Sequence, residues 1–300
     1  MYDLIVIGAG PAGITAAIYA ARKKIDVAVI TKDIGGQAAL SGDIENYTGY
    51  QFITGPELAA KFEEHLNKFA IQLKENEEVI EVQKKEAIVW VKSNKDIYEA
   101  KTVIIASGKR SRELGVPGEK EFKNRGLTYC ATCDAPLFSG KDVAVIGGGN
   151  SALDAALQLM KIAKHTYIIN ITSSLTGDPI MREKVESSKS VTVLNNTQVT
   201  EVFGDNLIKG IKIKKAGKQE ELKVEGVFVE IGLIPNTAFV QELDKNELGE
   251  IKVNARNETN IPGIFAAGDV TDVAEKQIII AAGEGSKAAL SAFRYLSKVR

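Results

Sequence analysis

The two cysteines of the chain, Cys130 and Cys133, are separated only by Ala131 and Thr132, and this spacing is suited to redox chemistry. One thiolate can attack a disulfide while its neighbour resolves the mixed disulfide that forms. A structural cross-link is a weaker interpretation, because so short a loop gives little entropic benefit. Two inert core thiols or half of a metal site would also fit the spacing, although a structural zinc site needs about four ligands. The motif therefore predicts a redox-active dithiol.

Length and composition limit the class of protein that can carry this dithiol. The chain has 300 residues, which is typical of about two domains, and a formal net charge of −1, which does not indicate nucleic-acid binding. With two cysteines in all, a disulfide framework of the secreted kind is excluded. The first residues lack the basic region of a signal peptide, and no apolar run approaches the ~18–20 residues that span a bilayer. We expect a cytoplasmic protein with neither nucleic-acid nor membrane partners.

An internal repeat organises the chain. Residues 2–20, "YDLIVIGAGPAGITAAIYA", resemble residues 141–159, "KDVAVIGGGNSALDAALQL", and each copy is an apolar run, a glycine turn and an alanine-rich helix pattern. Alternating segments typical of antiparallel strands follow in each half, over residues 77–100 and 197–224. The predicted fold class is α/β, with two Rossmann-like three-layer nucleotide-binding domains.

The segments around the repeat predict that the second domain is inserted in the first. Residues 55–73 have the spacing of an amphipathic helix, and a final helix is expected from about Ala282 to Ser297. The tail that contains this helix fits the first domain better than the second. We therefore predict an FAD-binding domain from residues 1–112 and 242–300, and an inserted redox domain, similar to a nicotinamide domain, from residues 113–241.

The first glycine turn has the spacing of a dinucleotide-binding site. Gly8, Gly10 and Gly13 follow a strand pattern and open a helix, whose N-terminus can bind phosphates. A turn that is needed only for packing is the alternative. Thr31 stands where such sites usually have an acid, which weakens a standard ribose contact without excluding FAD.

Four motifs extend the interpretation from a fold to a family. "DIGGQ" (33–37), "IENYTGY" (44–50), "CATCD" (130–134) and "IPGIFAAGDV" (261–270) occur in the order found in low-molecular-weight thioredoxin reductases, which the chain resembles almost end to end. The flavoprotein subunit of alkyl hydroperoxide reductase shares these motifs, and "LIPNTAF" (233–239) is closer to that branch. The resemblance implies a homodimeric flavoprotein that reduces thioredoxin.

The resemblance also implies roles for individual residues. Cys133 faces the flavin, Cys130 attacks the disulfide of the partner, and Asp134 donates and accepts the proton. Val79 lies by the adenine, Asp269 holds ribityl hydroxyls, and residues 276–278 close over the flavin, with Lys276 in place of the usual arginine. The full set expected to bind FAD is Gly8, Gly10, Pro11, Ala12, Gly13, Gly35, Gly36, Gln37, Asn46, Val79, Gly268, Asp269, Lys276, Gln277 and Ile278. The domains are expected to rotate about Gly108 and Gly232.

The second glycine turn, Gly147 to Gly149, keeps the nucleotide fold but lacks a cofactor clamp. Residues 167–174, "YIINITSS", contain neither the arginines that grip the 2′-phosphate of NADPH nor the acid that binds the ribose of NADH. Arg182 lies further along, and we expect it in solvent. NADP is therefore not expected as the donor.

A one-electron carrier is the predicted donor instead, because a flavin can accept electrons singly and pass them on in pairs. The chain then resembles the ferredoxin-dependent flavin thioredoxin reductases, which have a degraded NADPH signature. Acidic ferredoxin would dock on basic residues, although ordinary solvated charge also explains them: Lys109, Arg110, Arg112, Lys123 and Arg125. The alternatives are an NADPH- or NADH-dependent reductase of a thioredoxin or peroxiredoxin system, a small-molecule dithiol oxidase, and a redox-sensing flavoprotein.

Overall fold

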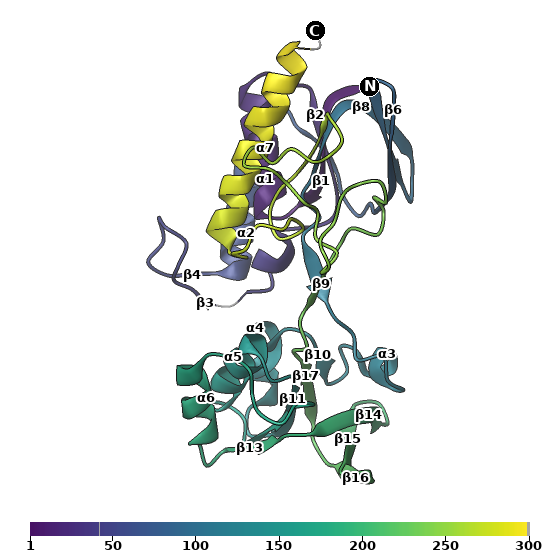
Figure 1. Cartoon of the computed structure of the whole chain (residues 1–300). Helices are drawn as coiled ribbons and strands as arrows, with labels where there is room; N and C mark the ends of the chain where they lie inside the picture. The colour runs from purple at the N-terminus through teal and green to yellow at the C-terminus, as the bar shows by residue number, and fades with distance from the viewer. Residues whose placement is uncertain (42, 299–300) are drawn as a thin grey trace. The chain divides into compact units, whose positions relative to one another are not determined.

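The computed structural model describes residues 1–41 and 43–298, with the side chains of residues 43, 132 and 133 outside the described part. The chain forms two compact α/β units, one from Met1–Arg110 with Ile234–Arg300 and the other from Ser111–Leu233 (Figure 1). Within the described residues, no helix combines the length and apolar character needed to cross a bilayer.

The first unit is built on one large sheet with the strand order β5-β2-β1-β8-β7-β6, and β19 pairs with β8. The strands β1, β2, β5, β8 and β19 are parallel where they pair, whereas β6, β7 and β8 form an antiparallel meander. The strand bounds are β1 Tyr2–Ala9, β2 Val27–Ile34, β5 Gln72–Lys74, β6 Val79–Lys85, β7 Ile88–Ser93, β8 Ile97–Ile105 and β19 Ile264–Ala266. The meander confirms the antiparallel strands predicted over residues 77–100.

The central strand β1 is apolar at successive positions because both of its faces are covered. Leu4 and Val6 pack on one face with the helices α1 (Pro11–Arg22) and α7 (Ile278–Lys298), which lie together in Figure 1. Ile5 and Ile7 pack on the other face with β6, β7 and the segment that contains Val240. The helices, the sheet and this second cover make the three layers that the repeat predicts.

The helix α2 (Gly55–Leu66) is shorter than the pattern over residues 55–73 predicts. It begins with a capping box, in which Thr54 and Glu57 satisfy each other's backbone N–H groups, and it buries Leu58 and Leu66. Beyond Leu66 the chain turns and enters β5, which pairs with β2. Strand pairing at the edge of the sheet therefore overrides the helical spacing of the last residues.

The second unit repeats the plan with a sheet of five parallel strands, in the order β10-β17-β11-β12-β13. Val143 and Val145 of β11 pack against the helix α5, whereas Ala144 and Ile146 pack against a separate antiparallel sheet, β14-β15-β16. The bounds are α3 Glu119–Phe122, β10 Leu127–Thr128, α4 Ala131–Asp134, β11 Asp142–Ile146, α5 Asn150–Leu159, β12 His165–Ile169, α6 Pro179–Glu186, β13 Val191–Leu194, β14 Thr197–Gly204, β15 Ile208–Lys215, β16 Lys218–Leu222 and β17 Gly226–Val229.

The chain passes between the units through two short strands that pair with each other, β9 (Lys109–Ser111) and β18 (Leu233–Pro235). Residues 234–241, which the sequence assigned to the inserted domain, pack on the first unit instead. Val240 is buried beside Ile5, and Phe239 O accepts a hydrogen bond of 3.0 Å from Val82 N. The units therefore divide at residues 110 and 233 rather than 112 and 241, because this apolar segment covers the first sheet.

The helices α1 and α7 approach so closely that a glycine is required at their contact. A Cβ atom on Gly285 of α7 would lie 2.0 Å from Ala12 O of α1. Gly283 lies two residues earlier on the same helix, and a Cβ atom there would meet nothing within 4 Å. The pair offers a matched test of this packing.

We predict that Gly285→Ala destabilises the protein by about 1–3 kcal/mol, because the new methyl group forces α7 away from α1. Gly283→Ala should instead be neutral or stabilise the protein by up to about 1 kcal/mol, because alanine favours the helix. Urea unfolding of the FAD-loaded protein, followed by far-UV circular dichroism, measures both changes. Equal stability of the two variants would contradict the close approach.

Candidate functional site

The first glycine turn provides an open surface beside the N-terminus of α1. A Cβ atom on Gly13 would lie 1.8 Å from Gly8 O, so the strand and the helix can meet only through glycine. A Cβ atom on Gly10 would meet nothing within 4 Å. Pro11 occupies the first turn of this 12-residue helix. The open space beside a helix N-terminus fits the pyrophosphate of a dinucleotide.

The structure brings other predicted cofactor residues to this turn from distant parts of the sequence. A Cβ atom on Gly36 would lie 3.4 Å from the Cα atom of Gly10, and one on Gly268 would lie 2.9 Å from the Cβ atom of Ala12. Gly35, like Gly36, has a positive φ angle, and the two start the 3-10 helix Gly36–Ala38. These contacts define one edge of the first sheet as a candidate cofactor site.

Polar side chains of the predicted set are joined in pairs. Asn46 donates a hydrogen bond of 3.1 Å from Nδ2 to Gln277 Oε1, across most of the sequence. Gln37 donates from Nε2 to Lys109 O at 3.2 Å. Ile278, at the start of α7, packs with the cluster under α2. Asn46 is therefore held beside Gln277, and Gln37 beside Lys109, within the first unit.

Two residues near the predicted adenine end serve the protein core. Val79 begins β6 and is buried in the cluster that covers the second face of the sheet. The hydroxyl of Thr31 is also internal: it accepts from Ala9 N at 3.1 Å and donates to Asp33 O. Thr31 thus fastens the end of β1 to β2, and this structural use explains why a threonine can replace the usual acid.

A buried ion cluster lies beside Asp269, and the sequence did not predict it. Glu250 Oε1 is 2.7 Å from Lys109 Nζ and 3.1 Å from Lys276 Nζ. Burial alone would raise the pKa of Glu250, but hydrogen bonds from Lys109, Asn246 and Lys276 outweigh it and lower the pKa to about 2. Burial raises the pKa of Asp269, and the two lysine charges act against that shift. The two lysines thus serve both carboxylates.

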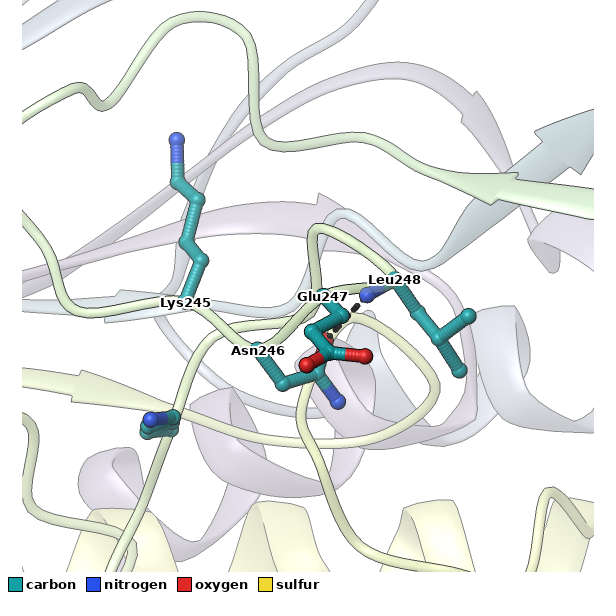
Figure 2. Close-up of a pocket in the computed structure, with 5 residues that line it drawn as sticks. Lys245, Asn246, Glu247 and Leu248 are labelled. Carbon is teal, nitrogen blue, oxygen red and sulfur yellow. Dashed lines mark hydrogen bonds between the residues drawn. The ribbon is translucent and has the colours of Figure 1, made fainter.

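Asn246 links this cluster to a surface turn, which Figure 2 shows in close-up. Its Oδ1 atom accepts from Leu248 N at 3.0 Å, and its Nδ2 atom donates to Glu250 Oε2 at 2.6 Å. The turn lines a pocket, and none of the predicted cofactor residues contributes to it. The lining residues are Lys245, Asn246, Glu247, Leu248 and Lys252. Asn246 therefore positions Glu250, and the pocket belongs to the outer turn.

The CATC motif lies at the start of the second unit, on the short helix α4 and the loop before it. Cys130 is disulfide-bonded, and the side chain of Cys133 lies outside the described part of the structure. Cys130 N donates to Thr128 Oγ1 at 3.1 Å, and Asp134 N donates to Cys130 O at 3.3 Å. Because α4 has only four residues, its macrodipole can do little to stabilise a thiolate.

Tyr129, directly before the motif, is anchored by a buried carboxylate. Glu119 accepts from Tyr129 Oη at 2.7 Å and from the backbone N–H groups of Leu114 and Gly115 at 2.6 Å each. Burial and the contact with Glu119 raise the pKa of Tyr129 well above its ordinary value. Glu119 thus holds Tyr129 in place, and Tyr129 directly precedes the first cysteine of the motif.

The second glycine turn is intact, but the polar side chain at the position expected to bind the ribose makes hydrogen bonds within the protein. A Cβ atom on Gly149 would meet nothing within 4 Å, whereas one on Gly148 would lie 2.4 Å from Asn170 Oδ1. Asn170 is 3% exposed. Its Oδ1 atom accepts from Thr172 N and Oγ1, and its Nδ2 atom donates to Asn195 Oδ1 at 2.8 Å. Asn170 therefore closes the strand end internally.

Arg182 differs from its prediction as a solvated residue. It is half-buried and donates from Nη1 to Leu175 O at 3.3 Å, beneath the loop that follows β12. Its Nε atom is buried with no hydrogen-bond partner among the described residues. Arg182 thus supports the loop from inside.

Of the five basic residues predicted to bind an acidic partner, Lys109 is not on the surface. Lys109 has a side chain only 12% exposed and pairs with Glu250, so it is not available to a docking partner. The other four residues are exposed, with Arg110 in the first unit and Arg112, Lys123 and Arg125 in the second. Lys123 lies over the ring of Tyr129, 5.2 Å from its centroid.

Glu230 is a second carboxylate that sequence reasoning missed. It follows β17 directly, its side chain is half-buried, and the backbone N–H of Ala131 in the CATC motif acts to lower its pKa. Burial raises the pKa of Glu230 to about 7, and the charge of Asp154 acts in the same direction. The available signal was its position, because ligands and reacting groups lie at the carboxyl ends of parallel strands.

The fold and these sites define a class: two nucleotide-binding units, one of which carries a disulfide-bonded redox motif. Residues 2–285 match the family described as pyridine nucleotide-disulphide oxidoreductase. The chain therefore belongs to that family.

Curated relatives match over nearly the whole chain. It is 44% identical to a "NADH dehydrogenase" of Ferdinandcohnia aciditolerans and 41% identical to an alkyl hydroperoxide reductase subunit of Staphylococcus epidermidis, each over 98% of this chain. These matches cover 57% and 59% of the relatives, so the chain spans less than two thirds of their length.

Solved structures match at full length. Thioredoxin reductase of Lactococcus lactis is 34% identical with a TM-score of 0.88, and the match covers 99% of this chain and 100% of that one. A ferredoxin-flavin thioredoxin reductase of Clostridium acetobutylicum is also 34% identical, with a TM-score of 0.56 and coverage of 99% and 98%. Both branches considered from the sequence thus have structural relatives.

We predict that Glu250→Gln destabilises the protein by about 2–4 kcal/mol at pH 7, because it removes the carboxylate that pairs directly with two partly buried lysines. The folded-state pKa of Glu250 is depressed to about 2, so its contribution is present above the unfolded value near 4.5 and fades as the pH falls toward 2. Urea unfolding at pH 7 and pH 3.5 should show the difference from the wild type shrinking at the lower pH.

Glu247→Gln is the matched control, since Glu247 is exposed in the same turn. It should change stability by less than about 0.5 kcal/mol. A Glu250→Gln variant as stable as this control at pH 7 would show that the ion cluster does not stabilise the first unit.

Proposed function

We propose that this chain is an FAD-dependent reductase that passes electrons through Cys130 and Cys133 to the disulfide of a thioredoxin. The observation that carries the proposal is the disulfide-bonded Cys130 at the start of a nucleotide-fold unit, in a chain that matches thioredoxin reductase from end to end. When bound, FAD would supply the electron pair. The predicted division into an FAD-binding unit and a redox unit agrees with this role.

Residues of the first unit would bind FAD through the site described above. The open turn at Gly10 and the N-terminus of α1 suit the pyrophosphate, while Asn46, Gln277 and Asp269 offer polar groups along the same edge. Because Asp269 lies near Lys276 and Lys109, its charge is partly balanced before any ligand arrives. Val79 would contribute apolar cover rather than a polar contact.

The dithiol would act by thiol–disulfide exchange. Cys130 as a thiolate attacks one sulfur of the thioredoxin disulfide, the partner's S–S bond breaks, and a mixed disulfide forms. Cys133 then attacks Cys130, which restores the CATC disulfide and releases thioredoxin with two reduced sulfurs. The released thiols need protons, and Asp134 follows the pair directly on α4, where it can supply one.

We infer that reduced ferredoxin is the electron donor. Asn170 supports this inference, because both of its polar atoms are committed to Thr172 and Asn195 and neither is free to bind a ribose hydroxyl. Arg110, Arg112, Lys123 and Arg125 remain exposed for an acidic partner. The ferredoxin-flavin enzyme of C. acetobutylicum, similar over 99% of this chain, adds to the support.

NADH is the second candidate donor, and the names of the relatives favour it. The F. aciditolerans relative, 44% identical, is called NADH dehydrogenase. The turn at Gly147–Gly149 keeps open space beside the N-terminus of α5 for a pyrophosphate. In this case the disulfide that the CATC pair reduces could belong to a peroxiredoxin system, as the S. epidermidis relative suggests.

We predict that the FAD-loaded protein is bleached anaerobically by reduced ferredoxin but not by micromolar NADPH or NADH, and that it then reduces thioredoxin. Absorbance near 450 nm follows the flavin, and alkylation of thioredoxin thiols follows the product. Cys130→Ser should retain FAD and bleaching but transfer nothing to thioredoxin. Rapid bleaching by NADH would assign the second donor, and thiol transfer by Cys130→Ser would refute the dithiol route.

We predict that Asn170→Asp creates activity with NADH where the wild type has little. Aspartate is nearly isosteric, so one oxygen can still accept from Thr172. The other oxygen would face Thr172 O and Asn195 Oδ1, to which the Asn170 amide donates, so repulsion turns it out of this contact and toward the ribose hydroxyls that a carboxylate selects. The NADH-dependent bleaching rate should rise at least about tenfold, equivalent to ~1.4 kcal/mol. Asn195→Asp, which changes the neighbouring amide, is the control. Unchanged NADH rates in a variant that folds would count against the role given to Asn170.

A further inference from the structure

Cys130 lies between two residues that pack on opposite faces of the five-stranded sheet. Tyr129, before it, packs with the cluster that contains residues of β14 and β15, whereas Ala131, after it, is buried in the cluster that contains residues of α5. Cys130 N donates to Thr128 Oγ1 at 3.1 Å, and Thr128 belongs to β10, which pairs with β17. The main chain therefore enters the CATC motif from a fixed position.

The carboxylate of Glu119 anchors Tyr129, and both of its oxygens accept hydrogen bonds. Oε1 accepts from Tyr129 Oη at 2.7 Å and from Leu114 N at 2.6 Å, and Oε2 accepts from Gly115 N at 2.6 Å. Glu119 is 2% exposed, so its charge depends on these donors for stabilisation. The Tyr129 hydroxyl is one of the three, and the carboxylate holds it in return.

The short helix α3, which carries Glu119, is itself fixed on the antiparallel sheet. A Cβ atom on Gly118, directly before α3, would lie 1.9 Å from Val202 O of β14. Val202 N also donates to Pro117 O at 3.0 Å, so the chain meets β14 at two successive residues. Through its contact with Tyr129, Glu119 therefore links the antiparallel sheet to the start of the CATC motif.

We propose that Tyr129, held by Glu119, is a positioning residue that stabilises the disulfide form of the CATC motif. A disulfide within one chain is favoured over the open dithiol by the effective concentration of the two sulfurs, which falls as the chain around them gains freedom. The hydrogen bond from Tyr129 to Glu119 is present while Cys130 is disulfide-bonded, and it restricts that freedom. The proposal rests on the function proposed above and adds a control on how readily the motif accepts electrons.

The step that this contact affects is reduction of the motif, and dithiothreitol serves as a chemically defined reductant for it. The S–S bond of the motif breaks, and each cysteine sulfur gains one electron and one proton. Dithiothreitol gives up these two electrons and two protons as it closes to its cyclic disulfide. The ratio of reduced to oxidised dithiothreitol at which the motif is half reduced then measures the equilibrium constant.

Tyr129→Phe removes only the hydroxyl that Glu119 binds and keeps the ring in its apolar cluster. The FAD-loaded protein is equilibrated without oxygen in mixtures of reduced and oxidised dithiothreitol, quenched with acid and alkylated. Mass spectrometry of the CATC peptide then gives its reduced fraction. We expect the equilibrium constant for reduction to rise about three- to fivefold in Tyr129→Phe, because loss of one hydrogen bond frees the chain beside Cys130.

Tyr98→Phe is the matched control, because it removes a hydrogen bond of the same kind from the first unit. Tyr98 Oη donates to Glu77 Oε1 at 2.7 Å, and Glu77 is 4% exposed. Both variants lose a tyrosine–carboxylate contact, so both should be less stable to urea than the wild type. Only Tyr129→Phe should change the reduction equilibrium of the CATC motif, and Tyr98→Phe should keep the wild-type value.

The outcomes separate this proposal from the proposed function. An unchanged equilibrium in a folded Tyr129→Phe protein refutes the positioning role, and so does a shift that makes the disulfide harder to reduce. An equal shift in Tyr98→Phe also overturns it, because the effect would then come from a general loss of stability. If dithiothreitol reduces the CATC motif but the motif never reduces thioredoxin, the proposed function fails, and the equilibria still decide the role of Tyr129.

Discussion

The contact between Gly8 O and the Cα atom of Gly13 sets the geometry from which the first unit is built. Because no side chain fits there, the strand β1 and the helix α1 meet at the tightest separation that the backbone allows. α7 then approaches α1 through Gly285, and Gly36 and Gly268 arrive at Gly10 and Ala12. Each of these approaches needs the one before it, since a displaced α1 would move the surface on which the later segments pack. The candidate cofactor edge is therefore a product of backbone packing first and of polar side chains second.

The charged groups of this unit follow from the desolvation that such packing imposes. Glu250 is 5% exposed, and a carboxylate so placed is stable only with cations and hydrogen bonds around it. Lys109 and Lys276 meet that need, which is why two residues expected at a surface or over a flavin turn toward the interior. The same two cations act on Asp269. One buried anion thus organises the electrostatics of the whole edge.

The second unit keeps the glycine turn, but the neighbouring polar side chains make hydrogen bonds within the protein. Asn170 closes the end of β12 with its side-chain hydrogen bonds, and Arg182 donates a hydrogen bond to the loop beyond it. A nucleotide fold can persist under such changes because its sheet and helices bury their own core, independent of any ligand. At the end of β12, the polar side chains therefore bind parts of the protein itself.

The sequence by itself determined the α/β class, the repeat, the dithiol and most of the segments that gather at the first glycine turn. These follow from local pattern: apolar runs, glycine spacing and adjacent cysteines act over a few residues and are visible without a fold. Only the tertiary structure decided that residues 234–241 pack on the first unit, that the helix after Thr54 ends at Leu66, and that Lys109, Glu250 and Lys276 form one cluster. It also decided that Asn46 donates a hydrogen bond to Gln277, more than two hundred residues away in sequence. Such contacts depend on which groups, distant in sequence, are desolvated side by side. That desolvation arises when the whole chain packs, and no single segment determines it.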